Sequence, residues 1–225
     1  MIDPKQYFKK WPRVYFTIGK IFGPLYLSGL DPKTFLKRYR MDGKSINLGS
    51  GPRSYPGLIN IDMESYPNVD IVSDAKHLPF KNGEISMVVC EEVFEHLDEP
   101  IVVVTELARI MAKGGFLYVS APFLYPYHAA PDDYQRFTLS GYRQLLKGFT
   151  IVETGARAGP FSALTVWLMY FLSYLSSFGS ERLYLYSLYF WMFLVWPIKY
   201  LDILGSRLPF SEHSAGNYFV VAKKN

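Results

Sequence analysis

Ser45-Ile46-Asn47-Leu48-Gly49-Ser50-Gly51 is the stretch that decides the fold, because an apolar run leads directly into two glycines. A second apolar run, Leu58-Ile59-Asn60-Ile61, follows soon after and ends on Asp62. A strand that runs into glycines lets the backbone approach a ligand closely, and an acidic residue that closes the next strand can accept hydrogen bonds from a ribose diol. Together the two runs indicate a site for an adenosine cofactor.

Strand and helix patterns alternate along the chain after these glycines. Strands are predicted over 69–74, 85–90 and 116–120, and the second is apolar enough to be buried on both faces. A helix begins at Glu99-Pro100 and is expected to end at Gly114-Gly115. This alternation predicts an α/β fold with a doubly wound, mostly parallel sheet, in which ligands bind at the carboxyl ends of the strands.

The short connection after the glycines distinguishes two kinds of adenosine cofactor. A pyrophosphate needs the N-terminus of a helix, but the segment from Gly51 to Leu58 has room for about one turn and contains two prolines. Asp62 also comes too early, because the dinucleotide pattern places its ribose acid about 20 residues after the glycines. S-adenosylmethionine carries no phosphate, so the short connection favours this sulfonium donor.

Five motifs along the chain then carry a family resemblance. They are Ile46 to Gly51, Ile59 to Asp62, Asp74 to Phe80, Glu91 to Leu97, and Glu106 to Gly115. In this order they resemble the class I S-adenosylmethionine-dependent methyltransferases of the type 11 group, over the stretch from Ile46 to about Gly148. The resemblance implies a Rossmann-like fold and an enzyme whose cofactor is S-adenosylmethionine.

The resemblance also implies a donor site at the strand ends. Gly49 and Gly51 would pass close to the methionine part, and Asp62 would hold the ribose hydroxyls. Asp74 and Ala75 would meet the adenine edge, and Glu91 would lie beside the donor. The usual acidic first residue of the glycine motif is replaced by an asparagine, which can still form hydrogen bonds but lacks the charge that favours a cationic donor. The expected cofactor-binding residues are Asn47, Gly49, Ser50, Gly51, Asp62, Asp74, Ala75 and Glu91.

The segment from Pro122 to Thr138 is the expected acceptor region, because it follows the fifth strand and is dense in prolines, aromatics and titratable groups. Methyl transfer needs alignment of nucleophile and methyl group and, for a hydroxyl acceptor, removal of a proton. His128 is the predicted base, with Asp132 or Asp133 as the carboxylate that orients it. Arg136 is expected to fix a carboxylate or phosphate of the acceptor.

Two alternatives to this assignment remain open. His128 and Arg136 could only hold a long loop to the domain, and His96, which follows the fourth strand, is a rival base. The loop from Pro122 to Thr138 also resembles that of methyltransferases found with bacterial and archaeal surface-polysaccharide enzymes. By analogy, this resemblance favours an acceptor that carries a sugar.

Composition limits the other function classes. The formal net charge of the 225 residues is +4, and without a basic stripe it does not argue for nucleic acid. The single cysteine, Cys90, lies in a predicted buried strand and fits a reducing cytosol. The four histidines show no ligand spacing, so no metal is predicted. The oligomeric state is left open.

An apolar insertion precedes the last predicted strand, Tyr218 to Ala222. Residues 158–180 contain no charge and would span about 30 Å as a helix, whereas residues 183–198 would reach only about 24 Å. The tryptophans and tyrosines in both pieces are typical of a membrane interface. Shallow docking on a membrane, a spanning hairpin, and a soluble lid or dimer seam all fit this pattern.

The expected organisation has four parts: an N-terminal helical cap over 1–44, a donor-binding core over 45–157, a hydrophobic helical insertion over 158–205 and a C-terminal strand over 206–225. The predicted function is methyl transfer to a hydroxyl or carboxyl of a glycan, glycolipid or related metabolite. The location is expected to be cytoplasmic, with membrane contact through residues 161–204. The alternative is a methyltransferase-like domain that has lost catalysis and serves as a membrane-associated scaffold.

Overall fold

The computed structural model describes residues 11–23, 29–129 and 132–225. Contacts between Cα atoms divide the chain into two compact units. Unit 1 comprises Met1–Gly29, Leu124–Tyr127 and Ala156–Asn217, and unit 2 comprises Leu30–Phe123, His128–Gly155 and Tyr218–Asn225. Unit 2 contains nearly all of the sheet, and unit 1 contains the apolar helices.

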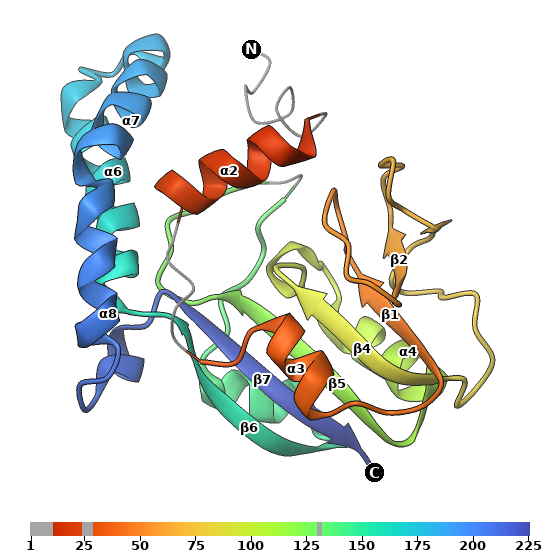
Figure 1. Cartoon of the computed structure of the whole chain (residues 1–225). Helices are drawn as coiled ribbons and strands as arrows, with labels where there is room; N and C mark the ends of the chain where they lie inside the picture. Colours follow the sequence, from red (N-terminus) through yellow and green to blue (C-terminus); the bar gives the residue numbers. More distant parts are fainter. Residues whose placement is uncertain (1–10, 24–28, 130–131) are drawn as a thin grey trace. The chain divides into compact units, whose positions relative to one another are not determined.

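Seven strands form one sheet, in the order β3-β2-β1-β4-β5-β7-β6. The pairs β1–β2, β2–β3, β1–β4 and β4–β5 are parallel, whereas β7 runs antiparallel to them (Figure 1). The predicted doubly wound, mostly parallel sheet is therefore confirmed. The strands are β1 Lys44–Leu48, β2 Ile59–Asp62, β3 Ile71–Val72, β4 Ile85–Glu91, β5 Met111–Pro122, β6 Phe149–Ala158 and β7 Asn217–Lys224.

Helices cover both faces of this sheet, with α3 (Pro32–Arg38) in front and α4 (Pro100–Ile110) behind in Figure 1. Phe35 of α3 packs into a core cluster with Met87 and Val89 of β4 and Tyr118 of β5. The intervening strand residues point to the opposite face, since side chains alternate along a strand. Both faces of β4 are thus buried, as its apolar sequence predicts. The remaining short elements of unit 2 are η1 Phe94–His96 and α5 Leu139–Leu145.

The predicted end of α4 is wrong. The helix ends at Ile110, and β5 begins at Met111, which pairs with Ile85. Gly114, at φ +79°, and Gly115 lie within β5, where the register with β4 shifts. A Cβ at Gly115 would lie 2.8 Å from the carbonyl oxygen of Ser86, so this glycine allows close approach of two strands.

The apolar insertion forms an antiparallel pair of helices, α6 (Pro160–Ser176) and α7 (Glu181–Val195), followed by η2 (Trp196–Leu201), α8 (Asp202–Gly205) and η3 (Ser211–Ser214). Helix α6 has 17 residues and α7 has 15, so the first piece forms the longer α-helix, but η2 and α8 continue α7 without a break. By length and hydropathy, the run Glu181–Gly205, of 25 residues, is the one helix among the described residues that could cross a bilayer.

A buried carboxylate joins the two ends of this insertion. Asp202, fully buried, accepts hydrogen bonds from the backbone N–H groups of Phe161 (2.9 Å) and Ser162 (2.7 Å). These donors belong to the first turn of α6 and have no partner within the helix, so Asp202 caps it from a distant segment.

The N-terminal helix also belongs to unit 1. Helix α2 (Pro12–Phe22) continues through Gly19, and Gly23 is its C-terminal cap residue. Its C-terminal carbonyls, those of Ile21 and Gly23, accept hydrogen bonds from Lys199 Nζ at 2.6 and 2.7 Å. Residues 1–10 and 24–28 of the expected N-terminal helical cap lie outside the described residues.

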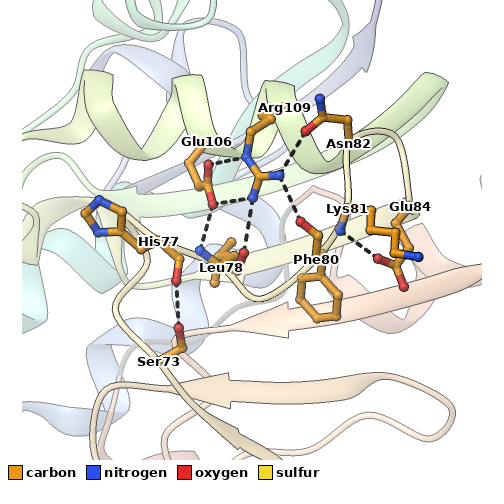
Figure 2. Close-up of polar contacts among 9 residues, drawn as sticks. All are labelled: Ser73, His77, Leu78, Phe80, Lys81, Asn82, Glu84, Glu106 and Arg109. Atoms are coloured by element: carbon orange, nitrogen blue, oxygen red, sulfur yellow. Dashed lines mark hydrogen bonds and ion pairs between the residues drawn. The ribbon is translucent and has the colours of Figure 1, made fainter.

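One side-chain pair fixes the segment between β3 and β4 (Figure 2). Arg109 of α4 donates to the carbonyl oxygens of Leu78 and Phe80 and to Asn82, and it pairs with Glu106 at 2.7 Å. Glu106 in turn accepts a hydrogen bond from Leu78 N at 2.7 Å. The bond from Arg109 lowers the pKa of Glu106 against the opposing effect of burial.

Replacing Glu106 with alanine should reduce the free energy of unfolding by about 1 to 3 kcal/mol at neutral pH, because Leu78 N and Arg109 lose a charged partner. A depressed pKa contributes stability above the unfolded-state value, and this contribution is lost as pH falls through the lower folded-state value. The difference between wild type and E106A should therefore hold at pH 6 to 7 and shrink below the ordinary value of 4.5. Urea titrations over this range measure it.

Glu99→Ala is the matched control for this measurement. Glu99 adjoins the start of the same helix, but its 60% exposed side chain pairs with Lys76 at the surface, where ion pairs contribute little. An E106A stability equal to that of E99A at neutral pH would contradict the anchoring role.

Candidate functional site

The loop after β1 is shaped by two left-handed glycines. Gly49 has φ +64° and Gly51 has φ +50°, conformations that L side chains rarely adopt. Ser50 N donates to Ile61 O at 3.0 Å, and Gly51 N donates to Asp62 Oδ2 at 2.7 Å. The end of β2 therefore holds the glycine loop, and the predicted residues Gly49, Ser50, Gly51 and Asp62 lie together.

Asn47 has a structural partner within this loop. Its side chain, buried in β1, donates to Asn60 Oδ1 at 3.0 Å and to Arg53 O at 3.2 Å. An amide can do both, whereas the acidic residue that is usual here could not donate. Asn47 thus links β1, β2 and the loop after the glycines.

Glu91, at the end of β4, is held by two residues that the sequence analysis did not single out. Its Oε2 accepts from Tyr55 O–H at 2.9 Å and forms an ion pair with Arg53. Both partners come from the short connection between β1 and β2, which crosses to the neighbouring strand end. The sequence did contain a signal for these two residues, because a connection this short keeps its side chains close to the ends of the strands.

These groups fit an adenosyl-sulfonium donor. A Cβ at Gly51 would meet no described atom within 4 Å, so this glycine borders open space. The carboxylates of Asp62 and Glu91 lie at the ends of β2 and β4, the two strands that flank β1, and can favour a cationic ligand or accept from a diol. Asp74 lies farther along the edge, after β3, with an exposed side chain that accepts from Lys76 N, and Ala75 follows it, half-buried.

A second cluster adjoins this edge, built from η1 and the segment after β5. It brings together Glu95, His96 and His128, and one potential ligand atom from each lies within 4.8 Å of those of the others. The two imidazole rings meet edge to face with centroids 5.5 Å apart. The structure therefore brings both candidate bases into one place.

The two predicted aspartates have different partners. Asp133 Oδ2 accepts from His128 N at 2.8 Å and lies 3.6 Å from His128 Nδ1. Asp132 contacts the other histidine, since its carbonyl oxygen bonds His96 Nδ1. Its carboxylate accepts from Tyr134 O–H at 3.2 Å.

Arg136 forms a two-pronged ion pair with Asp133. Burial opposes the charge of Asp133, but the bond from Arg136 outweighs it, and the pKa of this carboxyl is lowered. Arg136 thus neutralises a buried carboxylate, in addition to any contact with an acceptor.

Glu95 contrasts with Asp133. Its side chain is fully buried, and neither carboxylate oxygen has a hydrogen-bond partner among the described residues. Burial, reinforced by the nearby charge of Glu92, raises the pKa of Glu95 well above its usual range. Glu92 itself has φ +59°, a rare conformation for this residue, so the turn after β4 is strained.

Comparison with known proteins agrees with this geometry. Residues 55–119 match the sequence family described as a methyltransferase domain. No curated protein matches the chain in sequence. The matched part of the chain is therefore an S-adenosylmethionine-dependent methyltransferase domain.

Solved structures share the fold at low identity. One is a Thermotoga maritima S-adenosylmethionine-dependent methyltransferase, possibly a histamine N-methyltransferase (14% identity, TM-score 0.56, 98% of this chain and 99% of that one). A second is coclaurine N-methyltransferase (12%, 0.56, 98% and 86%). A third is Haemonchus contortus phosphoethanolamine N-methyltransferase 2 with S-adenosylmethionine (14%, 0.53, 100% and 60%).

Alanine substitutions at three glycines should separate strain from steric conflict. A Cβ at Gly49 would clash with Val93 Cγ2, and the backbone of Gly49 is left-handed as well, so G49A should lose about 2 to 4 kcal/mol of unfolding free energy. Gly51 has the strain alone, and G51A should lose about 1 to 2 kcal/mol. Gly148 has neither, and G148A should stay within about 1 kcal/mol. Chemical denaturation measures all three, and a different order would contradict the described loop.

Proposed function

We propose that this methyltransferase transfers a methyl group to a hydroxyl or carboxyl of a glycan, glycolipid or related metabolite at the cytoplasmic surface of a membrane. The observation that carries the proposal is the adjacency of two sites in unit 2, a donor edge at β1, β2 and β4 and a histidine cluster after β4 and β5. Methyl transfer needs such an arrangement, because the acceptor atom must be aligned with the donor methyl group.

On the donor side, Asp62 accepts from the ribose hydroxyls, and Gly49 and Gly51 allow the backbone to approach the methionine part. S-adenosylmethionine supplies an electrophilic methyl group on a sulfonium. Asp74 and Ala75 contact the edge of the adenine ring, and Asn47 and Ser50 shape the glycine loop. The support for these roles is the bond network that joins the glycine loop to Asp62.

On the acceptor side, His128 contacts the acceptor and assists loss of its proton, and Asp133 is the carboxylate that orients it. Arg136 and Asp132 belong to the same loop and hold Asp133 and His96. The short separation of His128 Nδ1 and Asp133 Oδ2, 3.6 Å, supports this role. His96 is close enough to share it. The sugar-bearing acceptor rests on the resemblance of the loop from Pro122 to Thr138 to those of surface-polysaccharide methyltransferases.

The membrane part of the proposal rests on the reversed polarity of the α6–α7 pair. Ser162, Thr165 and Ser173 are buried, whereas the large apolar side chains face outward. Among the latter, the exposed fractions are 50% for Trp167, 51% for Phe171, 57% for Phe190 and 63% for Phe193.

The buried hydroxyl groups of Thr165 and Ser173 are satisfied without water. Thr165 donates to Phe161 O at 2.7 Å and Ser173 to Met169 O at 2.6 Å, each within its own helix. Trp191 Nε1 bonds Ser176 Oγ between the helices at 3.1 Å. Small polar residues between helices and apolar residues outside suit a lipid environment. We favour shallow docking of the pair on a bilayer, with a dimer seam as the competing use of the same face.

A scaffold without catalysis is the second candidate, because Asn47 lacks the usual charge of the glycine motif. An enzyme must bind the donor, whereas a scaffold need not. Isothermal titration with S-adenosylmethionine therefore distinguishes the two, and absence of binding to the folded protein would favour the scaffold.

Asp62→Ala should weaken donor binding at least about tenfold, since two ribose hydroxyls and Gly51 N lose their acceptor at a cost of about 1.5 to 3 kcal/mol. Asp70→Ala is the matched control, because Asp70 also accepts from a backbone N–H, that of Asn60, at 2.7 Å. Calorimetry should show D70A within a factor of about two of wild type. Equal donor affinity of folded D62A and wild type would remove Asp62 from the donor site.

The docking surface can be tested by replacing Trp167, Phe171, Phe190 and Phe193 with serine. Full-length protein should float with neutral phosphatidylcholine vesicles at low and high salt, because apolar burial drives the contact. The fourfold variant should lose at least about tenfold in partitioning. A V72S/V152S variant is the control, since these exposed valines belong to the sheet. Wild type that stays monodisperse and dimeric without vesicles, and does not float, would assign the face to a dimer instead.

A further inference from the structure

The cluster of Glu95, His96 and His128 has the composition of a metal site. Imidazole nitrogens and a carboxylate oxygen are the ligands of many zinc centres, and a set of two histidines and one glutamate is typical of catalytic zinc with an open position. The three potential ligand atoms lie within 4.8 Å of one another. A tetrahedral ion with bonds of about 2.1 Å needs ligands about 3.4 Å apart, so small side-chain rotations would close the set.

Glu95 provides the second, independent observation. A buried carboxylate is costly unless it is paired, bonded to hydrogen donors or coordinated to a metal. Asp133, Asp202 and Glu91 each have such partners, in Arg136, the first turn of α6, and Tyr55 with Arg53. Neither oxygen of Glu95 has a hydrogen-bond partner among the described residues, and His96 Nε2 lies 3.7 Å from Oε1, beyond hydrogen-bond distance.

The partners of the histidines fit the same use. Metal-bound histidines usually donate their other ring N–H to a carbonyl or carboxylate, which fixes the ring. His96 Nδ1 contacts the carbonyl oxygen of Asp132, which directs Nε2 of this ring toward Glu95. His128 Nδ1 lies 3.6 Å from the carboxylate of Asp133. The two outer partners come from one short segment of the chain.

We propose that Glu95, His96 and His128 bind a divalent cation of the zinc type beside the donor edge. The inference deepens the proposed function and rests on it for the role of the cation. A bound divalent ion lowers the pKa of a coordinated hydroxyl and polarises its oxygen. In the metal-loaded protein, the coordinated hydroxyl would lose its proton to water, and His128 would assist as a ligand of the cation rather than as a free base.

Zinc binding by tag-free, full-length protein tests the site directly. After treatment with a chelator and dialysis, titration with Zn²⁺ followed by elemental analysis should show one ion per chain. Glu95→Gln keeps the shape of the side chain, and His128→Asn keeps a polar group. Each should weaken Zn²⁺ binding at least about a hundredfold, more than the loss of an outer partner costs. The exposed His77 lies outside the cluster, so His77→Ala is the matched control and should bind as wild type does.

Co²⁺ gives a spectroscopic readout that a merely structural role of these residues would not change. Wild type and H77A should give the visible absorption of a low-symmetry Co²⁺ site, and E95Q and H128N should not. No stoichiometric Zn²⁺ in wild type, or unchanged Zn²⁺ affinity in folded E95Q and H128N, would overturn the proposal. Binding of S-adenosylmethionine, measured on the same samples, separates this outcome from failure of the proposed function, because the donor site uses other residues.

Discussion

The parallel register of β1 with β2 and β4 is the constraint on which the proposed donor site depends. Leu48 lies opposite Ile61 on one side and Cys90 on the other, so the three strands end at one level. The residues that follow are Gly49, Asp62 and Glu91, and the hydrogen bond from Gly51 N to Asp62 then fixes the loop between two strands. Without this register, the same residues would be scattered along the sheet, and no donor edge would exist.

The buried carboxylates differ in their hydrogen-bond partners, and this difference separates those that stabilise the fold from one with an expected functional use. Asp202 caps a helix that lies 40 residues earlier in the chain, and Asp133 is paired with Arg136. Glu106, partly buried, anchors a loop through Arg109 (Figure 2). In each case the charge has hydrogen-bond donors that offset its desolvation. Glu95 departs from this pattern, and it does so beside two histidines and a strained turn, where a functional use is expected.

The two units differ in how they place polar groups. In unit 2, apolar side chains fill the space between sheet and helices, as in ordinary α/β proteins. In the α6–α7 pair of unit 1, Ser162, Thr165 and Ser173 are buried, whereas Trp167, Phe171, Phe190 and Phe193 are exposed. The hydroxyls of Thr165 and Ser173 bond to carbonyls one turn earlier in the same helix. An exposed apolar surface of this kind suits the proposed docking on lipid or on another apolar partner.

The sequence by itself determined the class of fold and the succession of most strands along the chain, because apolar periodicity and glycine positions are local properties. It also placed Gly49, Gly51, Asp62 and Glu91 at the carboxyl edge of the sheet, since each lies at the end of a recognisable strand or just after it. It misjudged the end of α4, where Gly114 and Gly115 signal a helix end but serve a close contact between β4 and β5. Only the tertiary structure brought Glu95 and His96 to His128, joined Arg53 and Tyr55 to Glu91, and turned the serines of α6 inward. These contacts join residues far apart in the chain or depend on which face of a helix is covered. A local sequence pattern predicts neither property.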